Sequence, residues 1–122
     1  MSGDARTMIA QVARDVQEQV PALAPLKLVV DVQLQGRGDL QIFRLQLPEC
    51  QVTKDMPDDA KVRVEMRRED FNRLAEEKSV KAWRKAVEDG TVRVSGVDQY
   101  MKLVAQVVDK QISRSQLKRA RQ

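Results

Sequence analysis

The sequence lacks histidine and has a single cysteine, Cys50, in 122 residues. Histidine and cysteine supply most zinc ligands, many general bases and the nucleophile–base pairs of catalytic triads. The remaining acidic candidates include two adjacent pairs, Asp58-Asp59 and Glu76-Glu77. Neighbouring side chains diverge on a helix or strand, so neither pair converges on one substrate atom. We therefore predict that the chain is not an enzyme and that it binds no metal and no cofactor.

Other shortages limit the expected location and partners. Aromatic residues make up only 3% of the chain, too few for a platform that stacks nucleic-acid bases. No apolar run approaches the ~18 residues of a membrane-spanning helix, and the N-terminus shows no apolar signal segment. One cysteine forms no internal disulfide and suits a reducing compartment. We expect a cytoplasmic protein that does not bind nucleic acid, and the sequence predicts no particular oligomeric state.

The positive charge of the chain is concentrated at its C-terminal end. Five basic residues and no acidic residue follow Asp109, namely Lys110, Arg114, Lys118, Arg119 and Arg121. Removing these five charges from the net charge of +4 leaves −1 for residues 1–109. We therefore expect residues 1–112 to form one domain and residues 113–122 to form a basic, flexible tail. Such a tail either binds RNA or makes weak contact with an anionic membrane, or it is simply solvated.

The stretch from Gly90 to Ile112 carries the clearest pattern in the chain. Val92 and Val94 alternate with polar residues at the two-residue period of a strand, between glycines that mark turns. The apolar residues that follow recur at helical spacing and form a wide apolar stripe. These residues are Val97, Tyr100, Met101, Val104, Val107, Val108 and Ile112. We expect an edge strand over Gly90–Gly96 and a helix over Asp98–Ile112 that packs across the sheet.

The rest of the chain divides into short elements of both kinds. Segments with the period of a strand are Leu26–Gln35, Leu40–Leu47, Gln51–Thr53 and Lys61–Met66. Segments with the period of a helix are Ala5–Val20, Arg68–Glu77 and Val80–Glu88, the last with Ser79 as its N-cap. Pro21 and Pro25 end the first helix and predict an extended connection. This order predicts an α+β domain with antiparallel strands and helices gathered on one face of the sheet.

One predicted strand changes phase along its length. Leu40 and Ile42 share one parity, whereas Phe43, Leu45 and Leu47 share the other. Either a β-bulge near Ile42 and Phe43 or a strand covered on both faces explains this pattern.

Three motifs together resemble the sterol carrier protein 2 family. The first is V-R-V-E-M-x-x-E-D-F-x-x-L-A-x-x-K over Val62–Lys78. The second is G-T-V-R-V-S-G over Gly90–Gly96, and the third is M-K-L over Met101–Leu103, on the last helix. The order of elements also fits this family, so the resemblance spans about residues 5–112.

The resemblance implies a fold and a non-catalytic function. It implies a five-stranded, mostly antiparallel sheet with helices on one face and an apolar tunnel between the two layers. Such a tunnel holds a hydrophobic small molecule, such as a sterol, a fatty acid or an acyl-CoA. The residues then expected to line it are Ile42, Phe43, Phe71, Leu74, Trp83, Val87, Val94, Tyr100, Met101, Val104 and Val108.

A second reading assigns the same apolar residues to a tight core. Apolar stripes on helices form a core by default, whether or not a ligand is bound. The chain would then be a docking or scaffold domain that binds another protein and holds no lipid. Bound lipid in the purified protein distinguishes the two readings.

Overall fold

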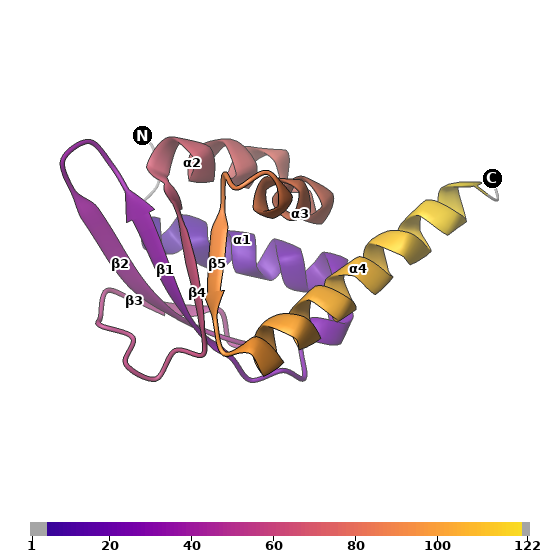
Figure 1. Ribbon diagram of the computed structural model, residues 1–122, viewed down its shortest axis with the longest axis horizontal. Coiled ribbons are helices and arrows are strands. Elements are labelled where there is room, and N and C mark those ends of the chain that lie inside the picture. Colours follow the sequence, from indigo (N-terminus) through magenta and orange to yellow (C-terminus); the bar gives the residue numbers. More distant parts are fainter. Residues whose placement is uncertain (1–4, 121–122) are drawn as a thin grey trace.

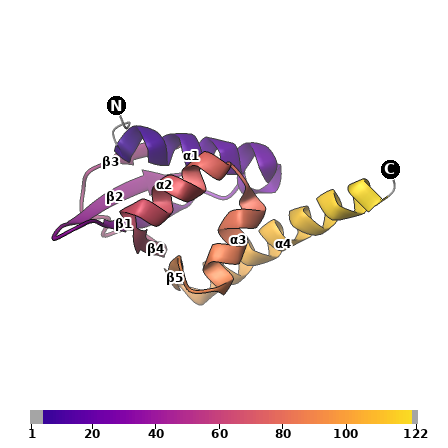
Figure 2. The same cartoon turned by 90° about the horizontal axis from the view of Figure 1, so that it is seen from above.

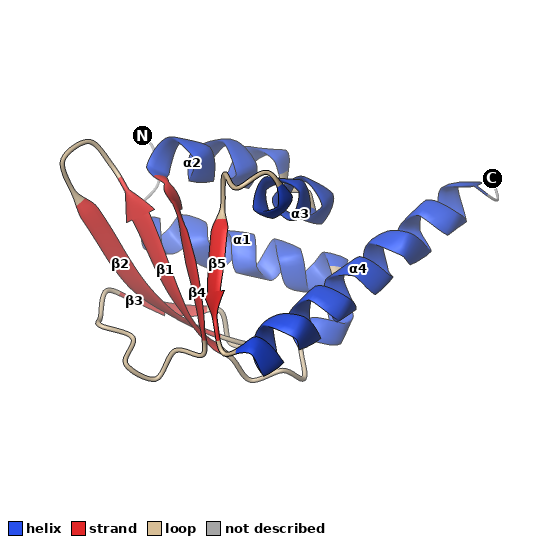
Figure 3. Ribbon diagram, in the orientation of Figure 1, coloured by secondary structure: helices blue, strands red, loops and turns tan. Residues whose placement is uncertain are grey.

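The computed structural model describes residues 5–120, with side chains as far as Ser115. One layer of helices packs against one sheet (Figures 1 and 3). The helices are α1 (Ala5–Gln19), the 3₁₀ helix η1 (Pro21–Leu23), α2 (Arg68–Glu77), α3 (Val80–Glu88) and α4 (Asp98–Ala120). The strands are β1 (Val29–Gln35), β2 (Leu40–Gln46), β3 (Gln51–Thr53), β4 (Val62–Arg67) and β5 (Arg93–Gly96). None of the described helices combines the length and the hydrophobicity that crossing a membrane requires.

The sheet confirms the predicted α+β fold. Its five strands lie in the order β3-β2-β1-β4-β5, and every neighbouring pair is antiparallel except β1 and β4. β5 lies at an edge, as the glycine-bounded pattern predicted. The parallel pair was not predicted, because the alternation of side chains along a strand is the same in both orientations. This pairing places the start of α2 beside the end of β1.

Both predicted explanations of the phase change in the second strand, a β-bulge and a strand covered on both faces, are wrong. β2 pairs with β1 without interruption, from Leu40 opposite Gln35 to Gln46 opposite Val29. Phe43 therefore points to the helix-covered face and is buried, while Ile42 points to the opposite face. The phase change arises because Leu40 and Ile42 are apolar residues on the open face of the sheet. Leu40 is 54% exposed there.

The core lies between the sheet and the helices α1, α2 and α3 (Figure 2). Phe71 and Leu74 of α2 are 2% and 1% exposed, and the Phe71 ring meets Trp83 of α3 edge to face at 6.3 Å. α3 begins as predicted, because the Ser79 hydroxyl accepts a hydrogen bond from the Ala82 amide at 3.2 Å.

The chain between α1 and β1 departs from the prediction. Instead of an extended connection, Pro21–Leu23 forms the 3₁₀ helix η1, with Pro21 at its first position. Proline suits this position because its fixed φ is already helical and its missing N–H has no partner to lose there. The turn buries Leu23 next to Val20.

The last helix also differs from the prediction in placement and length. α4 does not cross the sheet; it begins beside β5, lies along α3 and η1, and then extends away from the body (Figures 1 and 2). It continues to Ala120, so the predicted end at Ile112 is wrong. The apolar period stops at Ile112, but residues 113–120 include no glycine or proline, so nothing local ends the helix.

We predict that Gly96→Ala destabilises the fold far more than Gly38→Ala. Gly96 has a φ of +142°, and an added Cβ would overlap the Lys61 carbonyl oxygen and lie 2.9 Å from the Val62 Cα. Gly38 also has a positive φ of +79°, but its Cβ would meet nothing within 4 Å. The expected losses in the free energy of unfolding are about 3 kcal/mol and about 1 kcal/mol. Urea unfolding measures both, and equal losses would contradict the close approach of β5 to β4.

Candidate hydrophobic ligand site

Buried apolar side chains form two clusters on the helix-covered side of the sheet. The first contains the inner faces of β1, β2 and β4 together with residues of α1, α2 and α3. The second is smaller, with Val20, Leu23 and Val80 at its centre. The partly buried side chains packed around this second cluster are Val16, Leu26, Val104, Val107, Val108 and Ile112. Val104 of α4 contacts both clusters, so α4 lies where the two clusters meet.

Most of the predicted ligand-lining residues come together here. Phe43, Phe71 and Leu74 are buried within the first cluster. Those partly buried against it are Trp83, Val87, Val94, Tyr100 and Val104. Val108 packs against the second cluster. The prediction therefore selected residues of one contiguous apolar region.

Two of the predicted residues lie apart from this region. Ile42 points to the open face of the sheet, opposite Gln33 of β1. There it lines a shallow surface cleft with Leu40 and Met56. Met101 of α4 is half-buried but is assigned to neither apolar cluster. The structure does not bring either residue together with Phe71 and Trp83.

The space between α1, α2 and α3 is nearly filled. A cavity of about 10 Å³ lies there, lined among others by Val16, Leu74, Val80 and Trp83. That volume is about what one water molecule needs. Ligand pockets commonly measure about 300–1,000 Å³, so a lipid enters this region only if helices move apart.

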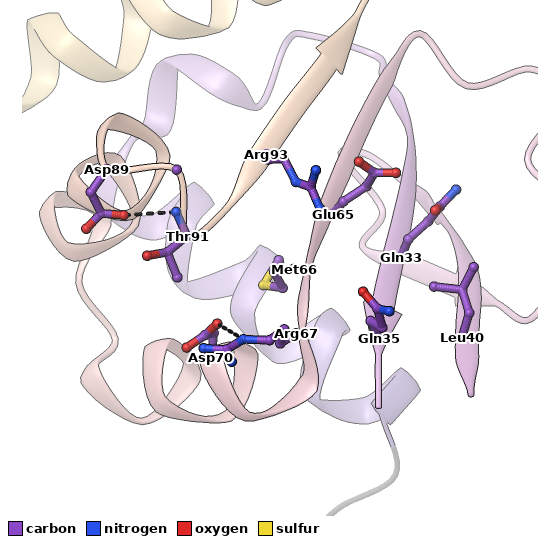
Figure 4. Close-up of a pocket in the computed structure, with 11 residues that line it drawn as sticks. Gln33, Gln35, Leu40, Glu65, Met66, Arg67, Asp70, Asp89, Thr91 and Arg93 are labelled. Atoms are coloured by element: carbon purple, nitrogen blue, oxygen red, sulfur yellow. Dashed lines mark hydrogen bonds and ion pairs between the residues drawn. The ribbon is translucent and has the colours of Figure 1, made fainter. Parts of the chain in front are cut away.

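A larger cleft, of about 500 Å³, lies on the surface beside the ends of β4 and β5 (Figure 4). Three of its charged side chains are already engaged: Arg67 donates to Asp70 at 3.0 Å, and the Thr91 amide donates to Asp89 at 2.9 Å. The hydrogen bond from Thr91 holds the pKa of Asp89 below its ordinary value. This polar cleft suits water better than an acyl chain.

α4 is the least deeply packed element around the second cluster. Between Asp98 and Ser115 every residue of α4 is half-buried or exposed. One ion pair joins it to α3, with Arg84 Nε 2.8 Å from Asp109 Oδ1, and this hydrogen bond raises the pKa of Arg84. Ion pairs that are this exposed contribute at most about 1 kcal/mol. Half-buried side chains and one surface ion pair therefore hold α4 in place.

The single thiol takes no part in this region. Cys50 is buried near α1, where its Sγ donates to Gln17 Oε1 at 3.1 Å. Burial raises the pKa of the thiol, so it stays protonated at neutral pH and is a poor nucleophile.

No protein-family model and no curated protein sequence matches the chain. Solved structures do match. Sterol carrier protein 2 like 2 from Aedes aegypti aligns with a TM-score of 0.56 at 15% identity, over 87% of this chain and 98% of that one. The chain has the sterol carrier protein 2 fold. The complex of Aedes aegypti sterol carrier protein 2 with palmitate aligns with a TM-score of 0.55 at 14% identity, covering 88% and 96% of the two chains.

The sterol carrier fold also matches part of a longer enzyme. A double mutant of the sec-alkyl sulfatase PisA1 aligns with a TM-score of 0.50 at 15% identity, over 72% of this chain but only 14% of the sulfatase. At these identities the likeness concerns the fold alone.

No pattern in the sequence marked the centre of the second cluster. Leu23 stands between two prolines in a segment with no helical or strand period, so no pattern marked it as buried. The signal available was a proline at the first position of a short turn, which is compatible with η1. Val20 and Val80 were assigned to helix faces, but nothing in the sequence paired them.

We predict that α4 opens more readily than the rest of the fold. The backbone amides of Val104–Ile112 should exchange with deuterium about 100-fold faster than those of β1, because none of the side chains described for α4, as far as Ser115, is fully buried. Helix α2, which buries Phe71 and Leu74, is the matched control and should exchange as slowly as β1. Equal protection of α4 and α2 would contradict loose attachment.

Proposed function

We propose that this chain is a non-catalytic lipid-binding protein. Its ligand is a sterol, a fatty acyl chain or a similar hydrophobic molecule, held between the helices and the sheet. The observation that carries the proposal is the second apolar cluster, whose buried residues Val20, Leu23 and Val80 are covered from one side by half-buried side chains of α4. Such a cover moves at lower cost than a fully buried helix. The palmitate complex of a protein with the same fold supports a lipid as ligand.

Movement of α4 supplies the space that the closed interior lacks. Burial of each CH₂ group contributes about 0.8 kcal/mol of favourable free energy. An acyl chain of ~14–16 carbons therefore has a gross driving force for binding of ~11–13 kcal/mol. Part of this free energy separates α4 from Val80 and Leu23, and the remainder appears as affinity. The ligand then replaces α4 as the cover of the apolar side chains.

The side chains around this region predict broad selectivity. Trp83 and Tyr100 are half-buried, and each combines an apolar ring with one polar atom. The side chains of the other predicted lining residues are apolar, so they offer a ligand no charge and no strong hydrogen bond. A site of this kind selects a ligand by length and shape rather than by headgroup.

We place the function in residues 1–112 and in the cytoplasm. Ile112 is the last residue with a described side chain that packs against either apolar cluster, and in this proposal residues 113–122 are dispensable for ligand binding. A single buried, protonated thiol suits the reducing environment of the cytoplasm.

A second candidate is a protein-docking domain with a tight core and no ligand. The cavity of about 10 Å³ favours it, because an interior this well filled is stable without a ligand. Such a domain would purify without lipid.

The deciding experiment is titration with palmitate. Trp83 is the only tryptophan, lies beside the small cavity and contacts Phe71, so its fluorescence reports on this region alone. We predict a change in its emission and a rise in Tm of about 5 °C at saturation, because palmitate binds only the folded state. No change in either signal, with palmitate or with cholesterol, would leave the docking domain as the better proposal.

A matched pair of variants locates the ligand. Val108→Ser removes an apolar side chain next to the second cluster and should weaken palmitate binding about tenfold. Leu40→Ser makes a similar change on the open face of the sheet and should bind palmitate as the unmodified chain does. Equal effects of the two substitutions would place the ligand elsewhere.

A further inference from the structure

The side of α4 that faces away from the body combines apolar and basic residues. Leu103, Lys110 and Arg114 follow one another at intervals of seven and four, which places them along one side of the helix. We call these three residues the outer stripe of α4. Leu103 is 40% exposed, and Lys110 and Arg114 are exposed. α4 extends away from the sheet toward its C-terminal end (Figures 1 and 2).

The charges on this part of the helix are not neutralised by the body. Asp109, the last acidic residue of the chain, is engaged by Arg84 of α3. No ion pair or hydrogen bond joins the side chains of Lys110 and Arg114 to another described residue. The sequence adds further positive charge beyond them, with no acid after Asp109. The projecting end of α4 therefore carries a concentrated positive field, although residues 1–109 have a net charge of −1.

We propose that the outer stripe of α4 docks on an anionic phospholipid surface. A helix that lies in a membrane interface combines basic residues, which attract anionic headgroups, with apolar residues that enter the acyl boundary. Lys110 and Arg114 supply the first kind, and Leu103 supplies the second. Val104, Val108 and Ile112, which cover the second cluster, lie on a different side of α4 from the stripe. Val107, four residues after Leu103, packs against the same cluster at the edge of the stripe. Docking through the exposed Leu103, Lys110 and Arg114 leaves these contacts with the body in place.

An anionic membrane fits the stripe better than two other occupants. A nucleic acid would match the charge but leaves Leu103 without an apolar partner, and the chain has few aromatic residues to stack on bases. A second copy of the chain, related by a two-fold axis, would bring Lys110 and Arg114 close to their own counterparts, where like charges repel. A bilayer surface provides both negative charge and an apolar layer.

The test measures binding of the full chain to phosphatidylcholine vesicles with and without about 30% phosphatidylserine. We expect binding only to vesicles that contain phosphatidylserine, and loss of binding as the salt concentration rises. Each basic residue contributes about fivefold near such a surface, so Lys110→Gln with Arg114→Gln should weaken binding about 25-fold. Leu103→Ser should weaken it several-fold at every salt concentration, because its contribution is apolar.

The control removes the same charge from the far end of the molecule. Arg37 in the β1–β2 turn and Lys54 after β3 are exposed, and Arg37→Gln with Lys54→Gln should leave vesicle binding unchanged. Three results would overturn the proposal: no binding to phosphatidylserine vesicles, equal losses in the two double variants, or binding of an RNA oligonucleotide but not of vesicles. Vesicle binding does not depend on palmitate, so this proposal and the lipid-binding function fail or succeed separately.

Discussion

The burial of one face of β1 is the interaction on which the remaining structure depends. Val30, Val32 and Leu34 alternate along this strand, and each is at most 8% exposed beneath the helices. β1 is hydrogen-bonded on both sides, antiparallel to β2 and parallel to β4. Because β4 runs parallel to β1, the chain leaves β4 at the end of the sheet where α2 folds back over the same apolar face. Phe71 and Leu74 then complete the core, and α3, β5 and α4 follow from the position of α2.

Local pattern predicted the elements well because each prediction rested on contacts within a few residues. Ser79 caps α3 through an amide three positions away, and Gly96 ends β5 where the backbones of two strands meet. The failures involve partners distant in sequence. The parallel pairing of β1 and β4 leaves no trace in the alternation of side chains, and the stripe of α4 indicates that one face is covered without indicating what covers it.

The same limit explains where the structure places the residues predicted to line the site. Residues with an unambiguous period, such as Phe71 and Val104, were assigned to the helix-covered side, where the structure places them. Ile42 and Phe43 were both predicted to line the site, but the uninterrupted register of β2 turns them to opposite faces of the sheet. Leu23 became buried through a turn that holds it against α4, a contact that no periodic pattern encodes. Burial of a side chain by residues distant in sequence depends on the whole fold, so a local pattern does not predict it.

The nearly filled cavity among α1, α2 and α3 has a thermodynamic consequence for any ligand of this region. A protein whose binding-competent form is rare binds with its intrinsic dissociation constant divided by the populated fraction of that form. If the open form costs about 3 kcal/mol, that fraction is below about 1%, and apparent affinity is lowered by more than about 100-fold. Tight closure in the absence of ligand therefore lowers the fraction of protein that any ligand occupies at a given concentration.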